Sequence, residues 1–104
     1  MTEPTKLVLT LADLRSHRDA ILALAEKHGA FNVRVFGSVA RGDATATSDV
    51  DFLVTWDYAQ VSSWGGVGLD FDLEDLLGVS VDVVSEGGLS PLVKSQILKE
   101  AIPL

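Results

Sequence analysis

Apolar residues recur along this chain at two different spacings, and each spacing predicts one kind of secondary structure. Between about residues 10 and 28 they return every three or four positions, which predicts a single amphipathic helix. Thr10 is suited to cap this helix with Asp13 as its capping-box partner, and Gly29 is suited to end it. The same helical spacing predicts two further helices, at 69–77 and from Pro91 to about Ala101.

Shorter segments alternate apolar with polar residues, as strands do. Strands are expected at 31–36, 49–55 and 79–84, with a further one around residues 7–9. The order of elements is then helix, strand, strand, helix, strand, helix. This order predicts an α/β (α+β) fold in which helices flank a mixed β-sheet of three to four strands. A chain of 104 residues has the length of one domain, so residues 1–104 are expected to fold as a single unit.

The charge balance narrows the range of partners. Eight basic and fifteen acidic residues give a net charge of −7, which repels the phosphates of nucleic acids. Long nucleic acid is therefore not expected as the primary partner. The apolar runs are far shorter than the roughly 20 residues needed to cross a bilayer, the N-terminus has no secretory pattern, and cysteine is absent. These features predict a cytoplasmic protein with no membrane partner.

Three aspartates in two predicted strands are the candidate catalytic and metal-binding residues. Asp49 and Asp51 are two positions apart, so their carboxylates share one face of a strand and repel each other unless a cation intervenes. Oxygen ligands of this kind suit Mg²⁺. Asp82 interrupts a run of valines and would join the pair if its strand lay beside theirs. The structural alternative is a loop end at Asp49, a solvated strand end at Asp51, and an edge strand whose polar side carries Asp82.

A glycine-containing turn follows the first predicted strand. Gly37 and Ser38 can direct backbone amides and a hydroxyl at phosphate oxygens, although a Gly-Ser pair alone usually marks an ordinary turn. Arg41 could bind phosphate or pair with one of the aspartates, and its position in the sequence leaves both possibilities open. Gly42 is expected to adopt a backbone angle that other residues resist.

These segments together resemble one known signature. Residues 37–42, five further residues and then residues 48–54 are similar to the motif of the DNA polymerase beta-type nucleotidyltransferase superfamily. Within it, the similarity is greatest to the minimal nucleotidyltransferases, the MntA-like antitoxins, and it covers nearly the whole chain, up to the segment around Asp82. The resemblance implies the nucleotidyltransferase fold and a two-metal mechanism.

The resemblance also implies roles for individual residues. Asp49 and Asp51 would hold two Mg²⁺ ions together with Asp82, and Asp82 would also favour deprotonation of the acceptor hydroxyl. Gly37 and Ser38 would contact the β- and γ-phosphates of ATP. The remaining candidates for nucleotide binding are Arg41 and Ser48.

The partner follows from the same resemblance. Minimal members of the family are similar to enzymes that transfer AMP from ATP to a tyrosine of a HEPN-type ribonuclease toxin, and an acidic surface would suit a basic, RNA-binding toxin. The chain is thus expected to be a Mg-dependent protein adenylyltransferase that serves as an antitoxin. Two alternatives remain open: an antitoxin that masks its toxin by binding alone, and an enzyme that modifies a small molecule such as an aminoglycoside.

Overall fold

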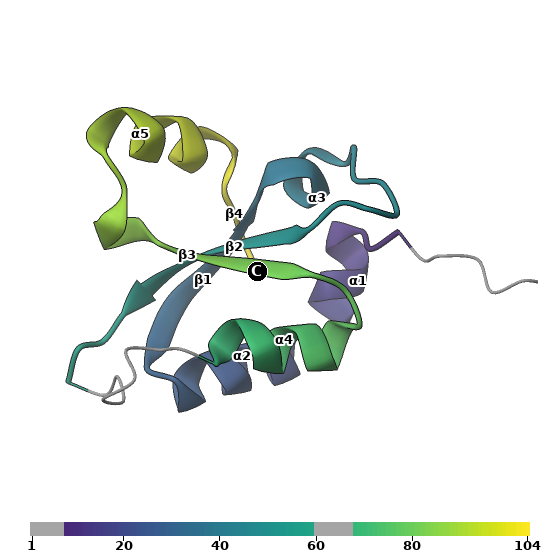
Figure 1. Cartoon of the computed structure of the whole chain (residues 1–104), viewed down its shortest axis with the longest axis horizontal. Helices are drawn as coiled ribbons and strands as arrows, with labels where there is room; N and C mark the ends of the chain where they lie inside the picture. Colours follow the sequence, from purple (N-terminus) through teal and green to yellow (C-terminus); the bar gives the residue numbers. More distant parts are fainter. Residues whose placement is uncertain (1–7, 60–67) are drawn as a thin grey trace, which may run out of the picture.

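A mixed sheet of four strands runs through the centre of the molecule in the computed structural model, which describes residues 8–59 and 68–104 (Figure 1). The strands are β1 (Ala30–Phe36), β2 (Val50–Trp56), β3 (Val81–Ser85) and β4 (Ile102–Pro103). Their order across the sheet is β3-β2-β1-β4. Strand β1 is antiparallel to both β2 and β4, whereas β2 and β3 are parallel. The predicted mixed sheet is confirmed.

Helices lie on both sides of this sheet (Figure 1). They are α1 (Leu11–Ser16), α2 (Arg18–Lys27), α3 (Gly37–Arg41), α4 (Leu69–Leu77) and α5 (Pro91–Glu100), with a short 3-10 helix η1 (Glu86–Gly88) before α5. Helices α2 and α4 pack together on one side, and α3 and α5 meet on the other. The helix expected at 69–77 is confirmed with those bounds. Among the described residues, no helix combines the length and apolar character needed to span a membrane.

The single helix expected at 10–28 is wrong, because two helices, α1 and α2, meet at His17. The predicted cap is confirmed: the Asp13 amide donates to Thr10 Oγ1 at 3.1 Å, and the Thr10 amide donates to the Asp13 carboxylate at 2.9 Å. The break has a local cause. The Ser16 hydroxyl donates to the Asp13 carbonyl at 2.6 Å, and His17 Nδ1 lies 3.0 Å from the same oxygen. These side chains occupy a carbonyl that a continuous helix would use for its own backbone.

The core lies on both faces of β2. Val50, Phe52 and Val54 share one face of this strand, and all three are buried. Leu53 points to the opposite face and is also fully buried. Strand β2 lies between β1 and β3, so both of its edges are hydrogen-bonded to neighbouring strands and both of its faces are covered. Groups that must reach water or a substrate are therefore confined to the ends of this strand.

The fourth strand comes from a different part of the chain than the apolar pattern indicates. A strand around residues 7–9 is not found, since Val8 and Leu9 are outside any strand and residue 7 is outside the described residues. The fourth strand is instead β4, which pairs with the second half of β1. Two residues are too few to show an alternating pattern, so the sequence gives no signal for it.

Candidate active site

The parallel pairing of β2 with β3 brings two of the predicted aspartates side by side. Asp51 is the register partner of Asp82, so the two side chains extend from the same face of the sheet at neighbouring positions. Asp49 directly precedes β2, and the amide of Val50 donates to the carbonyl of Ser80 at 2.9 Å. The condition for convergence, that these two strands lie together, is therefore met.

Negative charge accumulates around Asp51. Its carboxyl is half-buried, whereas Asp49 and Asp82 are exposed. Burial, reinforced by the charges of Asp82, Asp49 and Glu100, raises the pKa of Asp51 to about 6, and Arg41 opposes the rise only in part. A carboxyl that resists ionisation beside other carboxylates favours a cation as its partner.

The chemistry of these donors suits a divalent cation that is bound jointly with a substrate. Within the described ranges, no three carboxylate or imidazole side chains gather closely enough to hold a metal by themselves. Mg²⁺ characteristically takes one or two protein carboxylates and completes its coordination with water and substrate phosphates. Asp49, Asp51 and Asp82 fit that arrangement better than a closed structural metal site.

The turn between β1 and α3 lies directly against Asp51. Gly37 begins α3 with a φ of +76°, and a β-carbon at this position would collide with Asp51 Oδ2. Ser38 follows in the first turn of the helix and is half-buried. Gly42 ends this short helix in the left-handed region with a φ of +83°, as expected. The strand-to-helix turn and the aspartate pair thus form one continuous site.

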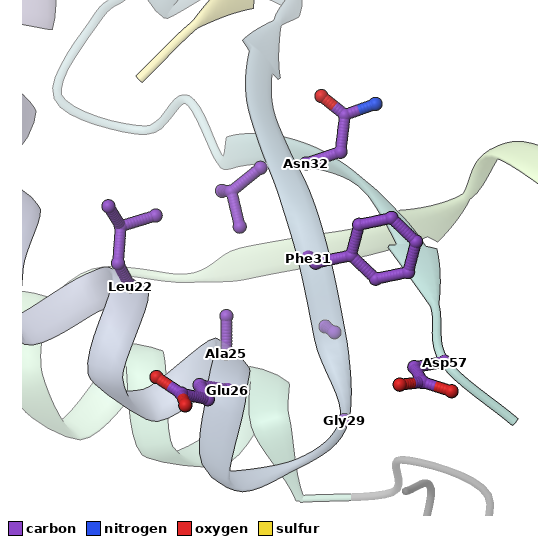
Figure 2. Close-up of a pocket in the computed structure, with 9 residues that line it drawn as sticks. Leu22, Ala25, Glu26, Gly29, Phe31, Asn32 and Asp57 are labelled. Atoms are coloured by element: carbon purple, nitrogen blue, oxygen red, sulfur yellow. The ribbon is translucent and has the colours of Figure 1, made fainter. Parts of the chain in front are cut away.

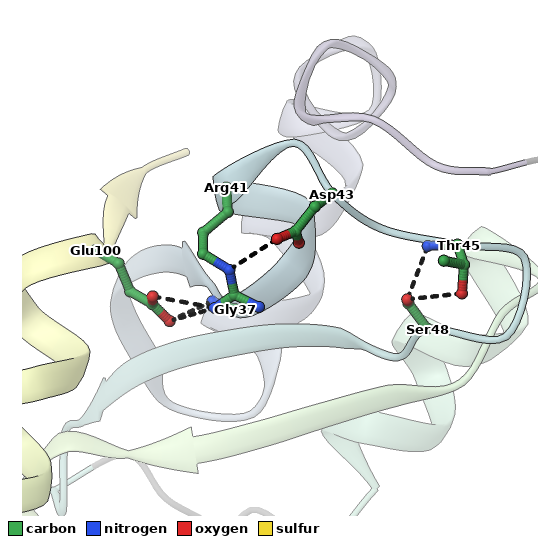
Figure 3. Close-up of polar contacts among 6 residues, drawn as sticks. All are labelled: Gly37, Arg41, Asp43, Thr45, Ser48 and Glu100. Atoms are coloured by element: carbon green, nitrogen blue, oxygen red, sulfur yellow. Dashed lines mark hydrogen bonds and ion pairs between the residues drawn. The ribbon is translucent and has the colours of Figure 1, made fainter.

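Arg41 pairs with two carboxylates that lie outside the predicted aspartate set (Figure 3). Its Nε lies 3.3 Å from Asp43 Oδ2, and its Nη1 lies 3.1 Å from Glu100 Oε2. These two carboxylates raise the pKa of Arg41 further above its ordinary value, chiefly through the hydrogen bond to Glu100. Glu100 Oε1 also accepts the backbone amide of Gly37 at 2.9 Å. Of the two possibilities left open for Arg41, pairing with one of the three aspartates is not observed.

Sequence reasoning does not identify Glu100 as a site residue. It is the last residue of α5 and lies 63 positions from Gly37 in the chain, so no local motif links the two. A glutamate at the end of an amphipathic helix ordinarily indicates only a solvated surface. Its position becomes apparent only when the helix is placed beside the turn.

Ser48 closes the loop that leads into β2. Its Oγ accepts the backbone amide of Thr45 at 2.8 Å and lies 3.2 Å from the Thr45 hydroxyl (Figure 3). This bond shapes the loop immediately before Asp49. In the described structure, Ser48 thus supports the position of the carboxylate that follows it.

A cavity of about 380 Å³ lies at the opposite end of β1 from this site (Figure 2). Its lining comes from α2, from the first half of β1 and from the end of β2, and comprises Leu22, Ala25, Glu26, Gly29, Ala30, Phe31, Asn32, Val33 and Asp57. None of the predicted catalytic or nucleotide-binding residues is among them. The cavity is therefore separate from the aspartate site.

Comparisons with known proteins place this geometry in a family. Residues 17–104 match the model of the nucleotidyltransferase domain. A protein of Methanocaldococcus jannaschii, provisionally named a protein adenylyltransferase, is 39% identical over 82 residues, covering 79% of this chain and 87% of the relative. The protein adenylyltransferase MntA of Thermococcus cleftensis is 36% identical over 97 residues, covering 91% of this chain and 96% of the relative.

Solved structures extend the comparison. A structure provisionally named a minimal nucleotidyltransferase has a TM-score of 0.80 and 50% identity, covering 92% of this chain and 97% of that one. A toxin–antitoxin structure with AMP-PNP (TM-score 0.68, 22% identity, covering 82% and 69%) shares the fold. So does a complex of a tri-AMPylated Shewanella oneidensis HEPN toxin with its MNT antitoxin (TM-score 0.62, 18% identity, covering 86% and 69%). Both the matched residues and the shared architecture lead to one conclusion: the chain belongs to the nucleotidyltransferase domain family.

Proposed function

We propose that this chain is a protein adenylyltransferase that acts as the antitoxin of a toxin–antitoxin pair. It transfers AMP from ATP to a hydroxyl, expected to be that of a tyrosine, on a HEPN-type toxin. The names of the two relatives support the reaction class. The AMPylated toxin in the Shewanella oneidensis complex, whose antitoxin has the same fold, supports the choice of acceptor.

The observation that carries the proposal is the register of β2 and β3. It sets Asp51 beside Asp82, with the Gly37 turn in contact with the Asp51 carboxylate. A triphosphate bound at this turn would have its reactive end beside the carboxylates. Positioning of this kind, together with charge stabilisation, accounts for most of the catalysis of phosphoryl-type transfer.

Each site residue has a task in this proposal. Gly37 allows the phosphate chain to approach the turn and Ser38 binds the β- and γ-phosphates there, while the Gly37 amide itself donates to Glu100. Arg41 and Ser48 complete the nucleotide site. Asp49 and Asp51 would hold Mg²⁺, and Asp82 would help to bind a second Mg²⁺ ion. When bound, the ions supply positive charge that offsets the charge of the triphosphate and of the leaving group.

The bond changes balance without an outside reagent. The acceptor oxygen forms a bond to the α-phosphorus of ATP, and the bond between that phosphorus and the bridging oxygen of the β-phosphate breaks. Pyrophosphate leaves with the electron pair of the broken bond. Asp82 is exposed and can take the proton of the acceptor hydroxyl and release it to water.

The direct test is intact-mass spectrometry of the partner toxin after incubation with this chain, ATP and Mg²⁺. A dose well below one chain per toxin should leave the toxin heavier by one or more AMP units, because a catalyst turns over. The toxin should stay inactive after this chain is removed. An unmodified toxin that is inhibited only at equal molar amounts would replace this proposal with the masking antitoxin.

A further inference from the structure

Glu100 connects the C-terminal end of α5 to the proposed nucleotide site (Figure 3). One oxygen of its carboxylate, Oε1, accepts the Gly37 amide at 2.9 Å and lies 3.3 Å from Arg41 Nη1. The other oxygen, Oε2, accepts from the same Nη1 at 3.1 Å. The Glu100 side chain is 32% exposed, so water only partly screens these contacts. A single carboxylate therefore joins the turn amide to the guanidinium.

The guanidinium of Arg41 is held from two sides. Nε donates to Asp43, Nη1 donates to Glu100, and the two carboxylates lie on either side of the planar group. An arginine has five N–H donors in a fixed fork. The hydrogen bonds of Arg41 to the described residues use Nε and Nη1, which leaves the donors of Nη2 for a ligand.

We infer that Glu100 is a positioning residue for nucleotide binding, which fixes the Gly37 turn and the Arg41 guanidinium relative to each other so that both can meet one phosphate chain. The inference rests on the proposed function. A long arginine side chain loses rotamer freedom when it is immobilised. A protein that holds it in place beforehand spares the ligand that loss.

The charge of Glu100 allows a clear test, because charge repulsion and positioning predict opposite changes in ATP affinity when this charge is removed. The carboxylate is an anion close to a site proposed for a more highly charged anion. If repulsion dominated, removal of this charge would tighten ATP binding. If positioning dominates, removal loosens Arg41 and the turn, and ATP binding weakens.

The experiment compares Mg²⁺-ATP affinity by calorimetry for wild type, Glu100→Ala and Glu100→Gln. Glu100→Ala should weaken binding about fivefold or more, the size of coupling expected between groups in contact. Glu100→Gln keeps the volume and one acceptor oxygen, so it should be intermediate and should melt close to wild type. Glu26→Gln changes an exposed glutamate on α2 and should leave the affinity unchanged.

A double-mutant cycle separates positioning from a general effect on the fold. In an Arg41→Ala background, Glu100→Gln should weaken binding less than it does in wild type, because one of the two groups that Glu100 positions is gone and only its bond to the Gly37 turn remains. The Gly37 amide resonance in a ¹H–¹⁵N spectrum of the nucleotide-free protein should move in Glu100→Ala and stay in place in Glu26→Gln.

The outcomes are distinct. Unchanged or tighter Mg²⁺-ATP binding by Glu100→Gln overturns the positioning role while leaving the proposed function intact. Additive losses in the cycle also overturn it, since they would mean that Glu100 and Arg41 act independently. A wild-type chain that fails to bind Mg²⁺-ATP overturns the proposed function, and the inference falls with it.

Discussion

Gly37 lies so close to Asp51 that a β-carbon on the glycine would collide with Oδ2 of the aspartate. The proposed phosphate-binding turn and the central carboxylate are therefore in contact. Gly37 is also at a φ of +76°, which disfavours any side chain. Two separate physical reasons thus require glycine here, and a second glycine, which caps the C-terminal end of α3, allows them to be told apart.

Gly37→Ala should destabilise the protein more than Gly42→Ala. Both glycines have a similar positive φ, but nothing lies within 4 Å of a β-carbon at Gly42. The left-handed angle costs an alanine about 1–2 kcal/mol at either site. The additional loss at Gly37, expected to be about 1–2 kcal/mol from displacement of Asp51, is measured by chemical denaturation. Equal losses for the two variants would mean that Asp51 moves aside without cost.

Asp82→Asn should remove transfer and spare the fold. The side chain is exposed at the edge strand β3, so its replacement should change the free energy of unfolding by less than about 0.5 kcal/mol. AMP transfer should fall at least about 100-fold, the usual contribution of a group that handles a proton. Asp75→Asn, an exposed aspartate on α4, is the matched control. A variant that melts well below wild type would show that Asp82 has a structural role.

Asp51→Asn should stabilise the metal-free protein at neutral pH. A carboxyl whose pKa rises from 3.8 to about 6 on folding contributes stability that is complete below pH 3.8 and lost as the pH rises through 6. Asparagine resembles the neutral form at every pH. After allowance for solvent screening, the gain should be about 1 kcal/mol near pH 7 and should vanish in acid. Thermal melts in EDTA across this range test it; a less stable variant at neutral pH would contradict it.

Glu86→Gln should show the opposite dependence on pH. Glu86 accepts a 2.9 Å hydrogen bond from Nη1 of the buried Arg34, and this bond lowers the pKa of the glutamate below its ordinary value of 4.5. The contribution is present above pH 4.5 and is lost as the pH falls through the lowered pKa. The variant should therefore be less stable than wild type at neutral pH, and their denaturation midpoints should converge in acid. A gap that persists in strong acid would point to packing rather than charge.

Much of the site is visible in the sequence because its parts are local. An Asp-x-Asp pair at a strand end and a glycine after a strand each have a geometry that spacing alone determines. The pairing of Asp51 with Asp82 could be predicted only on the condition that their strands are neighbours, because the spacing of residues does not show which strands pair. The contacts of two acidic residues on α4 are not visible in the spacing, because an acidic face of an amphipathic helix ordinarily indicates contact with water. Asp72 lies 2.7 Å from His28 Nε2, and Glu74 accepts the Val81 amide at 3.0 Å.

The features that escape prediction depend on distant contacts. Glu100 meets Gly37 only after the last helix packs beside α3, and β4 exists only because β1 offers an open edge. The helix break at His17 is local, but it depends on which side chain takes one carbonyl oxygen. Hydrophobic periodicity carries no information about such a choice.

The parallel pairing of β2 with β3 also determines when the site can appear during folding. The β1–β2 hairpin joins nearby segments and can form early, and it already holds the Gly37 turn, Asp49 and Asp51. A parallel neighbour needs a complete crossover, which is a slower, long-range event. Asp82 takes its place only when β3 pairs after that crossover, and Glu100 only when α5 packs after β3. A half-folded chain therefore has the Gly37 turn, Asp49 and Asp51 but lacks Asp82 and Glu100 in place. During refolding, activity should recover later than the β1–β2 hairpin forms, and it should report only fully folded molecules.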